Sequence, residues 1–391
     1  MNILSVVGAR PNFMKIAPFI NAINLYNNNN PENRIKHTLL HTGQHYDIRM
    51  SESFFKRLNI PDPDINLEVG SGSHAKQVGT TMIFFEKIIL REKPDWVVVV
   101  GDVNATLACS VTAKKLNVKV CHIEAGLRSN DMSMPEEINR LVTDRISDLL
   151  LTPDRLSVKN LLNEGVPEKN IKFVGNIMID TLEANRQTAS KLSVEEIINE
   201  NRLTGNKIIK IPAEINSGIR KNSPLFTVVT MHRPSNVDHK EILEPILDFL
   251  ITEVASDMPV IWPLHPRTEK MLKKFDLWEK AVKKQNMVLL HPVGYHEMLK
   301  LNMEATLVMT DSGGLQEECC VLGTPCLTLR RNTERPITLK KYGGASVLTG
   351  NEIKKIREEY KKALLTGKVP RRPDLWDGQT AKRCLDAIIN Y

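Results

Sequence analysis

The sequence ILSVVGARPNFMK, residues 3–15, holds the pattern that decides the fold. Its run ILSVV predicts a buried strand over residues 3–7, the glycine that follows predicts a turn, and the rest has helical spacing. Arg10 and Lys15 are therefore predicted at the carboxyl edge of a parallel sheet, beside the start of a helix. Ligands bind at that edge in open α/β sheets, although a helix start with ordinary surface charge would give the same local pattern.

Strand, turn and helix patterns of this kind recur along the chain. Their alternation predicts parallel sheets with helices on both faces, which is the α/β class. At 391 residues the chain suits two Rossmann-like domains with an active-site cleft between them. The predicted strands are residues 3–7, 36–40, 96–100 and 118–123 in the first series and 226–230, 260–264, 287–290, 306–310 and 326–329 in the second.

Domain boundaries follow from the same alternation. The N-terminal domain is predicted over residues 1–180 and the C-terminal domain over residues 181–370. Residues 379–391 are apolar at helical spacing and follow a proline-rich segment. We therefore expect residues 371–391 to return to the first domain and end in a helix that packs on it.

Composition excludes several classes of protein. The chain has 53 Lys and Arg against 46 Asp and Glu, and this excess of +7 is spread without a basic block, which argues against nucleic acid and for a small anion. None of the six cysteines forms a CxxC pair, so a reducing compartment is expected. Because no signal peptide and no apolar run of about 18 residues is found, we expect a cytoplasmic protein without a membrane segment.

The second series contains a candidate anion site. In TDSGGLQEE, residues 310–318, Ser312, Gly313 and Gly314 would present backbone N–H groups and a hydroxyl at the start of a helix. Such an arrangement suits a diphosphate. Glu318 follows about one turn later, where its carboxylate could accept hydrogen bonds from ribose hydroxyls. A plain helix cap is the alternative, but it explains the pair of glycines less well.

Polar side chains also follow other predicted strands. Asp102, Glu124 and His232 each come directly after one, and the carboxyl ends of parallel strands converge in space. Glu136 and Arg140 share a helix face at i, i+4 in the segment PEEINR, where a surface ion pair is the alternative interpretation. Carboxylates and cations gathered at one sheet edge are the groups that acid–base chemistry on an anionic substrate requires.

Neither a metal nor a cofactor is expected. The DPD of residues 62–64 matches a metal-binding Asp-x-Asp signature, but its proline-rich setting favours a turn. His41 and His45 have the spacing of zinc ligands on a helix, but they flank Thr-Gly at a strand end and would not share a face. The glycine turn after the first strand forms neither a dinucleotide fingerprint nor a P-loop.

Taken together, these motifs resemble those of the non-hydrolysing UDP-N-acetylglucosamine 2-epimerases. Any single motif would be weak evidence, but they run in the family's order over nearly the whole chain. The matching segments are VGARPNFMK (7–15), HTGQHY (41–46), GD (101–102), HIEAGLR (122–128), PEEINR (135–140), SGGLQEE (312–318) and TERP (333–336).

The resemblance implies a fold and a reaction. It implies two Rossmann-like domains in the glycosyltransferase B arrangement, with UDP held mainly by the second domain and a cleft that closes on the substrate. The implied reaction eliminates UDP across C1–C2 of the sugar, giving 2-acetamidoglucal, and adds UDP back with protonation from the other face. A UDP-sugar substrate and a homodimer are also implied.

By motif position, the resemblance also implies roles for individual residues. The acid and base are drawn from three carboxylates without dividing the two roles, and His232 would contact the diphosphate. The implied catalytic residues are Asp102, Glu124, Glu136 and His232. The implied substrate-binding residues are Arg10, Lys15, Arg140, Ser312, Gly313, Gly314, Glu318 and Arg335.

Two departures from the family pattern bear on regulation and binding. Bacterial members bind a second, activating UDP-N-acetylglucosamine through a Gln-His pair and a later arginine; Gln44 and His45 match the pair, but residues 65–82 contain no arginine. Many bacterial members also read HRREN where this chain has HRPSN, residues 232–236.

Four other functions remain open from the sequence. A UDP-linked diacetamido uronic acid could be the substrate of the same C2 chemistry. A glycosyltransferase would share the UDP site but would not need the three carboxylates. A hydrolysing epimerase would release free N-acetylmannosamine, and a sensor would bind the UDP-sugar without turnover.

Overall fold

The structure is a computed structural model that describes residues 1–43, 61–203, 211 and 225–391. The chain divides into two compact units. Unit 1 contains Met1–Ala184 and Pro373–Tyr391, and unit 2 contains Asn185–Arg372. Within the described ranges, none of the helices combines the length and apolar character that a membrane span requires.

Unit 1 is built on a seven-stranded sheet in the order β3-β2-β1-β4-β5-β6-β7, and its neighbouring strands pair in parallel. The central strand WVVVV of β4 is buried throughout, as expected for a sheet covered on both faces. The strands are β1 (Asn2–Val7), β2 (Lys36–His41), β3 (Ile65–Asn66), β4 (Trp96–Val100), β5 (Lys119–Ile123), β6 (Leu149–Thr152) and β7 (Ile171–Phe173).

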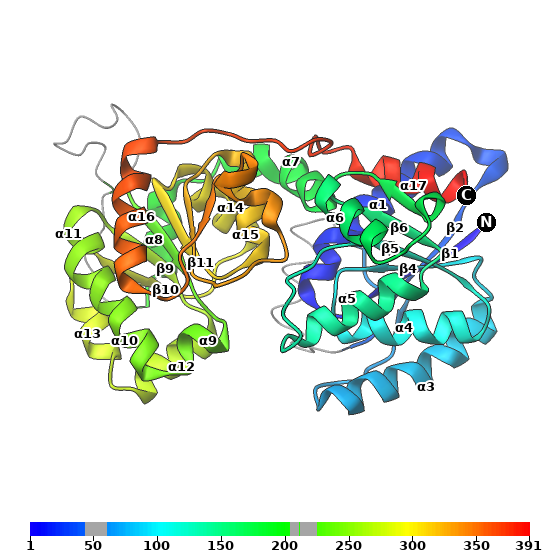
Figure 1. Ribbon diagram of the computed structural model, residues 1–391, viewed down its shortest axis with the longest axis horizontal. Coiled ribbons are helices and arrows are strands. Elements are labelled where there is room, and N and C mark those ends of the chain that lie inside the picture. The colour runs from blue at the N-terminus through cyan, green and yellow to red at the C-terminus, as the bar shows by residue number, and fades with distance from the viewer. Residues whose placement is uncertain (44–60, 204–210, 212–224) are drawn as a thin grey trace. The chain divides into compact units, whose positions relative to one another are not determined.

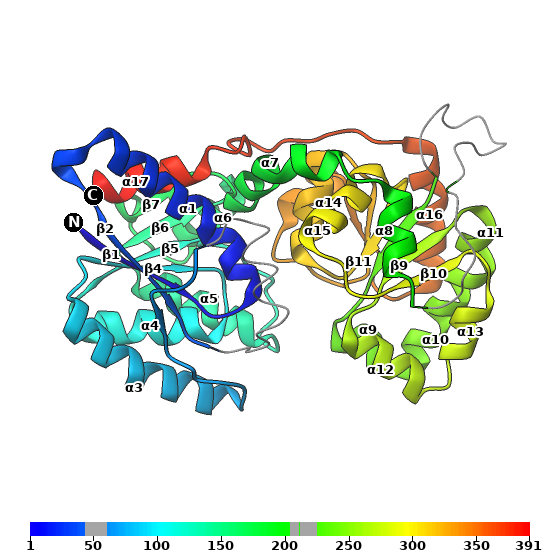
Figure 2. The same ribbon diagram turned by 180° about the vertical axis from the view of Figure 1, so that it is seen from behind.

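Helices cover both faces of this sheet (Figures 1 and 2). Helices α3, α4 and α5 lie on one face, while α1 and α17 pack together on the other. Asp180 of α7 accepts hydrogen bonds from the backbone N–H groups of Thr380 and Ala381, which caps the start of α17. The helices are α1 (Arg10–Asn29), α3 (His74–Glu92), α4 (Asn104–Lys115), α5 (Pro135–Ile146), α6 (Arg155–Asn163), α7 (Ile177–Ser190) and α17 (Thr380–Ile389).

Unit 2 has a six-stranded parallel sheet in the order β10-β9-β8-β11-β12-β13. Its core has two layers: α10, α12, α13 and α16 pack on one face, and α8, α14 and α15 on the other. The strands are β8 (Thr227–Thr230), β9 (Val260–Pro263), β10 (Met287–Leu290), β11 (Leu307–Thr310), β12 (Cys326–Thr328) and β13 (Ser346–Leu348). The helices are α8 (Val194–Asn201), α9 (Pro234–Val237), α10 (Lys240–Phe249), α11 (Ala255–Asp257), α12 (Pro266–Lys274), α13 (Trp278–Lys283), α14 (Tyr295–Glu304), α15 (Gly313–Leu322) and α16 (Ile353–Thr366).

The strand order places a topological switch point in each unit. In unit 1 the chain turns one way from β1 and the other way from β4, and these two strands are neighbours. In unit 2 the same reversal occurs between β8 and β11. Open α/β sheets bind ligands beyond the carboxyl ends of the strands at such points. The candidate residues after these four strands therefore lie where each sheet is best suited to hold a ligand.

The α/β prediction is confirmed, and every predicted strand corresponds to an observed one. Four observed strands were missed, namely β3, β6, β7 and β13. Each has only two to four residues.

Candidate active site

The first part of the site in unit 1 is a buried ion pair. Glu124 follows β5, and its carboxylate pairs with Nζ of Lys15 from α1; the two side chains are 2% and 9% exposed. A Cβ on Gly101, at the end of β4, would lie only 3.3 Å from Lys15 Nζ and 3.4 Å from Glu124 Oε2. The glycine therefore lets the β4 end approach this pair closely.

Glu124 has a left-handed backbone, with φ of +72°. A residue with a side chain pays roughly 1 kcal/mol or more to adopt this conformation, so the surrounding structure must enforce it. Strained backbone of this kind concentrates at functional sites. The conformation directs the end of β5 so that the carboxylate meets Lys15.

A second carboxylate and cation lie beside the first pair. Asp102 follows β4 and pairs with Nη1 of Arg140 from α5. Arg140 is 2% exposed and is held from its other side by Glu137, with Nη2 and Oε2 2.8 Å apart, whereas Asp102 is 27% exposed. Glu137 in turn accepts hydrogen bonds from the backbone of Ser129 and Asn130. The arginine is thus fixed, and the Asp102 carboxylate is presented to solvent.

Glu136 is placed differently from the other two candidate carboxylates. It lies in the first turn of α5 and is exposed, and among the described residues it makes no hydrogen bond or ion pair. The ion pair with Arg140 that the i, i+4 spacing allows is not formed, because Arg140 is bonded to Glu137 and Asp102. The buried partner of Arg140 is therefore the glutamate next to the one that the sequence singled out.

Two asparagines fix the loops that carry these groups. Asn12 of α1 donates to the carbonyl of Val100 over 2.8 Å and accepts from the N–H of Ala9 over 2.9 Å. Asn139 of α5 donates to the carbonyl of Asp102 over 2.8 Å. Sequence reasoning missed both, although each belongs to a quoted motif, because an asparagine that bonds a distant carbonyl carries no local signature.

In unit 2 a buried carboxylate positions a histidine. Asp311, after β11, accepts from Nδ1 of His232 over 3.0 Å and from the backbone N–H groups of His232 and Arg233. Burial opposes its charge, but the hydrogen bonds and charge of His232 lower the pKa of Asp311 below its usual value. With Nδ1 engaged and 42% of the side chain exposed, His232 can present Nε2 to an oxygen of a ligand.

The two glycines at the start of α15 have different surroundings. A Cβ on Gly313 would lie 2.7 Å from both Arg335 Nη1 and Glu334 Oε1, whereas one on Gly314 would meet open space. Arg335 also pairs with Glu317 through Nε over 2.8 Å. The side chain of Ser312 makes no capping bond to the helix. The start of α15, with its backbone N–H groups, is therefore open beside Gly314, whereas Arg335 packs beside Gly313.

Glu318 is fully enclosed one turn further along α15. Its carboxylate accepts from the side-chain amide of Asn302 over 3.2 Å. Burial in a site whose partner is neutral raises the pKa of Glu318 to about 7, so the group titrates near neutral pH. Glutamates with such pKa values are common at functional sites, although structural burial produces the same effect.

Comparison with known proteins decides the family. The family model described as UDP-N-acetylglucosamine 2-epimerase matches residues 27–389, which is most of the chain. The chain belongs to the UDP-N-acetylglucosamine 2-epimerase family. Membership confirms the resemblance that the motifs indicate.

Relatives of this 2-epimerase family member extend over both units. A UDP-N-acetylglucosamine 2-epimerase of Methanocaldococcus jannaschii is 42% identical over 358 residues, covering 91% of this chain and 90% of the relative. A crystal structure of a 2-epimerase from the same organism, in complex with UDP-GlcNAc and UDP, has a TM-score of 0.85 at 38% identity and full coverage of both chains. The predicted pair of Rossmann-like domains, the glycosyltransferase B type of fold, is confirmed.

One relative has a different substrate in its name. A UDP-2,3-diacetamido-2,3-dideoxy-D-glucuronate 2-epimerase of Pseudomonas aeruginosa is 38% identical over 354 residues, covering 90% of this chain and 88% of the relative. Relatives named for two different UDP-sugar substrates are thus about equally similar in sequence to this chain.

Some predicted residues of this family member lie outside the described structure. Arg10 is the first residue of α1, but its side chain is not among the described ones. Gln44 and His45, the candidate allosteric pair, fall outside the described residues. Asp64 of the DPD segment accepts from the backbone N–H of Leu39 in β2 over 2.7 Å.

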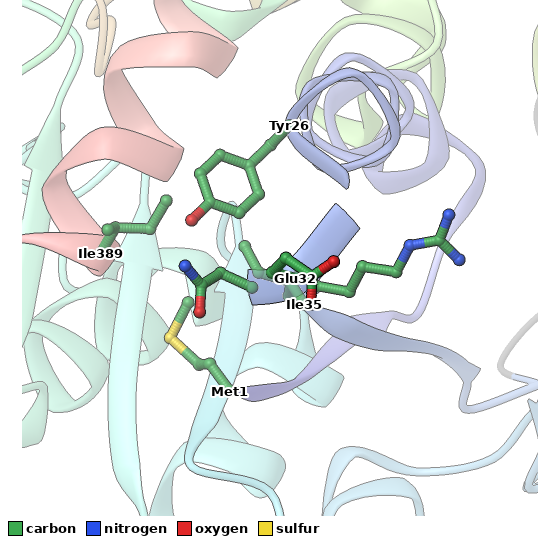
Figure 3. A pocket seen from close by; sticks show the side chains of 7 residues that line it. Met1, Tyr26, Glu32, Ile35 and Ile389 are labelled. Atoms are coloured by element: carbon green, nitrogen blue, oxygen red, sulfur yellow. The ribbon is translucent and has the colours of Figure 1, made fainter. Parts of the chain in front are cut away.

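A pocket of about 370 Å³ in unit 1 lies away from the candidate residues (Figure 3). It opens where β1 and β2 begin, at the amino edge of the sheet, whereas Asp102 and Glu124 lie at the carboxyl edge. Open α/β enzymes bind substrate at the carboxyl edge, so this pocket is not assigned to the epimerase site. It is lined by Met1, Tyr26, Glu32, Asn33, Arg34, Ile35 and Ile389.

Proposed function

We propose that the protein interconverts UDP-N-acetylglucosamine and UDP-N-acetylmannosamine by inverting C2 through elimination and re-addition of UDP. The observation that carries the proposal is the pair of neighbouring ion pairs in unit 1, Glu124 with Lys15 and Asp102 with Arg140. Two carboxylates lie at adjacent strand ends, and each is paired with a cation. Such a pair is suited to take a proton from one face of a carbon and to return a proton to the opposite face.

The chemistry requires both an acid and a base. No carbonyl group is attached to C2, so its proton is not acidic enough for simple removal and return. A base instead takes the C2 proton, the C–H electrons form the C1=C2 bond, and the C1–O bond to UDP breaks. UDP and 2-acetamidoglucal are the products. In the return step a diphosphate oxygen attacks C1 and an acid protonates C2 from the opposite face.

Glu124 and Asp102 are the proposed proton-transfer groups. Lys15 pairs with Glu124 in a buried setting, and Arg140 pairs with the partly exposed Asp102. Glu136 remains a candidate of the same motif, exposed and without a partner among the described residues. A carboxylate of this kind contributes typically about 10²–10⁴-fold to turnover as an acid or base.

Unit 2 supplies the proposed diphosphate site. His232, Ser312, Gly313 and Gly314 would donate to the diphosphate, whose charge rises as the C1–O bond breaks. Arg335 adds positive charge beside Gly313, and Glu318 would accept from the ribose hydroxyls. Arg10 completes the proposed set through its place at the start of α1.

A second candidate substrate is a UDP-linked diacetamido uronic acid. The Pseudomonas aeruginosa relative bears that specificity in its name at 38% identity, close to the 42% of the UDP-N-acetylglucosamine enzyme. The acid–base pairs and the diphosphate site serve either substrate, because the reacting C1–C2 unit is the same. Selectivity must come from contacts to the substituents at C3 and C6.

The decisive experiment is incubation with UDP-N-acetylglucosamine in D₂O with EDTA, followed by NMR of the sugar. UDP-N-acetylmannosamine with deuterium at C2 supports the elimination route and shows that no chelatable metal is needed. Free N-acetylmannosamine with UDP would instead identify a hydrolysing enzyme. An unchanged sugar, with turnover of the diacetamido uronate, would establish the second candidate.

The setting of the enzyme is proposed on the family resemblance. A homodimer is proposed, and light scattering coupled to size exclusion tests it. A cytoplasmic location is proposed as well, and all six cysteines are free and buried, as suits a reducing compartment. Cell fractionation tests the location.

A further inference from the structure

Four ionisable side chains that the proposed chemistry does not use form a cluster next to the turn that carries Glu124. His122 of β5 has Nδ1 2.6 Å from Oδ1 of Asp144 in α5, and both side chains are fully buried. Nη1 of Arg128 lies 2.7 Å from Oδ2 of the same aspartate. Glu164 completes the cluster by accepting two bonds of 2.7 Å from Arg128. His122, Arg128 and Asp144 are buried, and Glu164 closes the cluster at its more exposed end.

Both ring nitrogens of His122 have partners. Its Nε2 lies 2.9 Å from the carbonyl oxygen of Gly101, which can only accept, so Nε2 is the donor of this bond. Its Nδ1 faces the Asp144 carboxylate. Burial opposes ionisation of Asp144, but the charges and hydrogen bonds of His122 and Arg128 lower the pKa of Asp144. His122 therefore bridges the end of β4 to α5.

Asp144 binds the chain on both sides of Glu124. On the N-terminal side of Glu124, Asp144 binds the ring of His122. On the C-terminal side, it accepts from the backbone N–H of Gly126 over 3.0 Å and from the side chain of Arg128. Glu124, in the middle, has the left-handed φ of +72°. A strained residue keeps its conformation only when its surroundings over-determine it, and these bonds fix both flanks of the turn.

The same cluster also reaches the second proposed catalytic carboxylate. The carbonyl that His122 binds belongs to Gly101, the residue directly before Asp102, and Gly101 has a left-handed φ of +71°. One buried aspartate is thereby connected to the backbone that presents both Glu124 and Asp102.

We propose that Asp144 is a positioning residue for the reaction: through His122, Gly126 and Arg128 it holds Glu124 and Asp102 at their places relative to the reacting carbon. The inference rests on the proposed epimerase function. It assigns no proton transfer to Asp144 or His122, since neither has access to solvent or substrate.

The chain offers a matched control four residues away. Asp148 also accepts a backbone bond at β5, from the N–H of Val120 over 2.7 Å, and pairs with Lys114 over 2.8 Å. It does so at the opposite, amino end of the strand. Loss of its charge should lower stability without moving Glu124.

The experiment compares Asp144→Asn with Asp148→Asn in three measurements: kcat and KM, the free energy of unfolding, and the backbone ¹³C chemical shifts of Glu124, which report its φ. An asparagine at 144 places an NH₂ group against the donors that a carboxylate oxygen satisfies. We expect Asp144→Asn to lower kcat by about 10–100-fold with KM within threefold, and to move the Glu124 shifts. Asp148→Asn should leave kcat and those shifts unchanged.

Equal losses of kcat in the two variants, in proportion to stability, would overturn the proposal, as would unchanged Glu124 shifts in Asp144→Asn. If Asp144→Asn does not fold, His122→Gln replaces it, because glutamine can still donate to Gly101 but not to Asp144; the same changes are expected at smaller size. The chemical shifts do not depend on turnover. A wild type without epimerase activity therefore refutes the proposed function while the shifts still decide the role of Asp144.

Discussion

The two units present different chemical groups at the carboxyl edges of their sheets. In unit 1 cations from α1 and α5, Lys15 and Arg140, hold carboxylates that are presented for chemistry. In unit 2 buried carboxylates, Asp311 and Glu317, hold a histidine and an arginine. The presented group differs: beside the switch point of each sheet, unit 1 exposes the carboxylate of Asp102 and unit 2 exposes the imidazole of His232.

This difference matches the division of labour in the proposed reaction. Groups that move protons must be able to bind and release them, as carboxylates can, whereas groups that stabilise a diphosphate must be hydrogen-bond donors or cations. If this is correct, damage to unit 1 should reduce kcat, and damage to unit 2 should reduce affinity for UDP. The predictions below test that separation, from the largest expected effect to the smallest.

Glu124→Gln should give the largest effect. The amide keeps the size of the side chain but cannot transfer a proton, so kcat should fall by about 10²–10⁴-fold. Affinity for UDP, measured by calorimetry, should change little. Turnover is followed by NMR of the anomeric proton. A variant that kept kcat and lost UDP binding would contradict the assignment of proton transfer to unit 1 and UDP binding to unit 2.

Glu318 sharpens the comparison, because it is a buried carboxylate bonded to a neutral amide instead of a cation. Burial raises its pKa from 4.5 to about 7, so the folded protein binds this proton more tightly than the unfolded chain does. Its contribution to stability is therefore complete below about pH 4.5 and is lost as the pH rises towards 7, by about 3 kcal/mol.

Urea unfolding between pH 4 and 8 checks this prediction. Glu318→Gln should remove that part of the pH dependence. The control is Glu241→Gln, whose side chain is 76% exposed, and which should leave the slope as in the wild type. A wild type and Glu318→Gln with parallel pH profiles would show that the carboxylate does not titrate as stated.

His232→Ala tests the proposed diphosphate site of unit 2. Loss of a hydrogen bond from this side chain to a charged diphosphate should weaken UDP binding by about 10–100-fold, equivalent to about 1.5–3 kcal/mol. His239→Ala is the control, since His239 is largely exposed at the start of α10. Calorimetry with UDP distinguishes the two, and equal affinities would remove His232 from the diphosphate site.

The two glycines of α15 give the smallest and most local contrast. Gly313→Ala should cost about 1–3 kcal/mol of stability, because its Cβ would overlap Arg335 and Glu334. Gly314→Ala should leave stability within about 0.5 kcal/mol and lower UDP affinity, because its methyl group enters the open side of the helix start. The opposite ranking in urea unfolding would show that the packing on the two sides has been misassigned.

The sequence predicted the buried strands and the residues that closely follow them. Strands such as WVVVV are buried on both faces and read as continuous apolar runs, and residues such as Asp102 and His232 follow a strand directly. For these residues, knowing the end of the strand is enough to place the side chain at the sheet edge. The motif order then identified the family.

The buried face of α5 could not be predicted, because that face carries charged residues while apolar residues of the helix are exposed. Glu137, Arg140 and Asp144 are buried, while Ile138 and Val142 are 44% and 36% exposed. Hydrophobic periodicity therefore predicts the wrong face of this helix. The partners that make burial of the charged residues favourable come from distant segments, and no local rule reveals them.

Unit 1 is built from two segments that are far apart in the sequence, Met1–Ala184 and Pro373–Tyr391. Helix α17, capped by Asp180 and packed on α1, is separated from the rest of unit 1 by the whole of unit 2. At about 5–20 residues per second, roughly 190 intervening residues take about 10–40 s to synthesise. During that time the face of α1 that α17 covers has no partner from its own unit. Unit 2 can therefore complete its fold before unit 1 does, although its synthesis begins second.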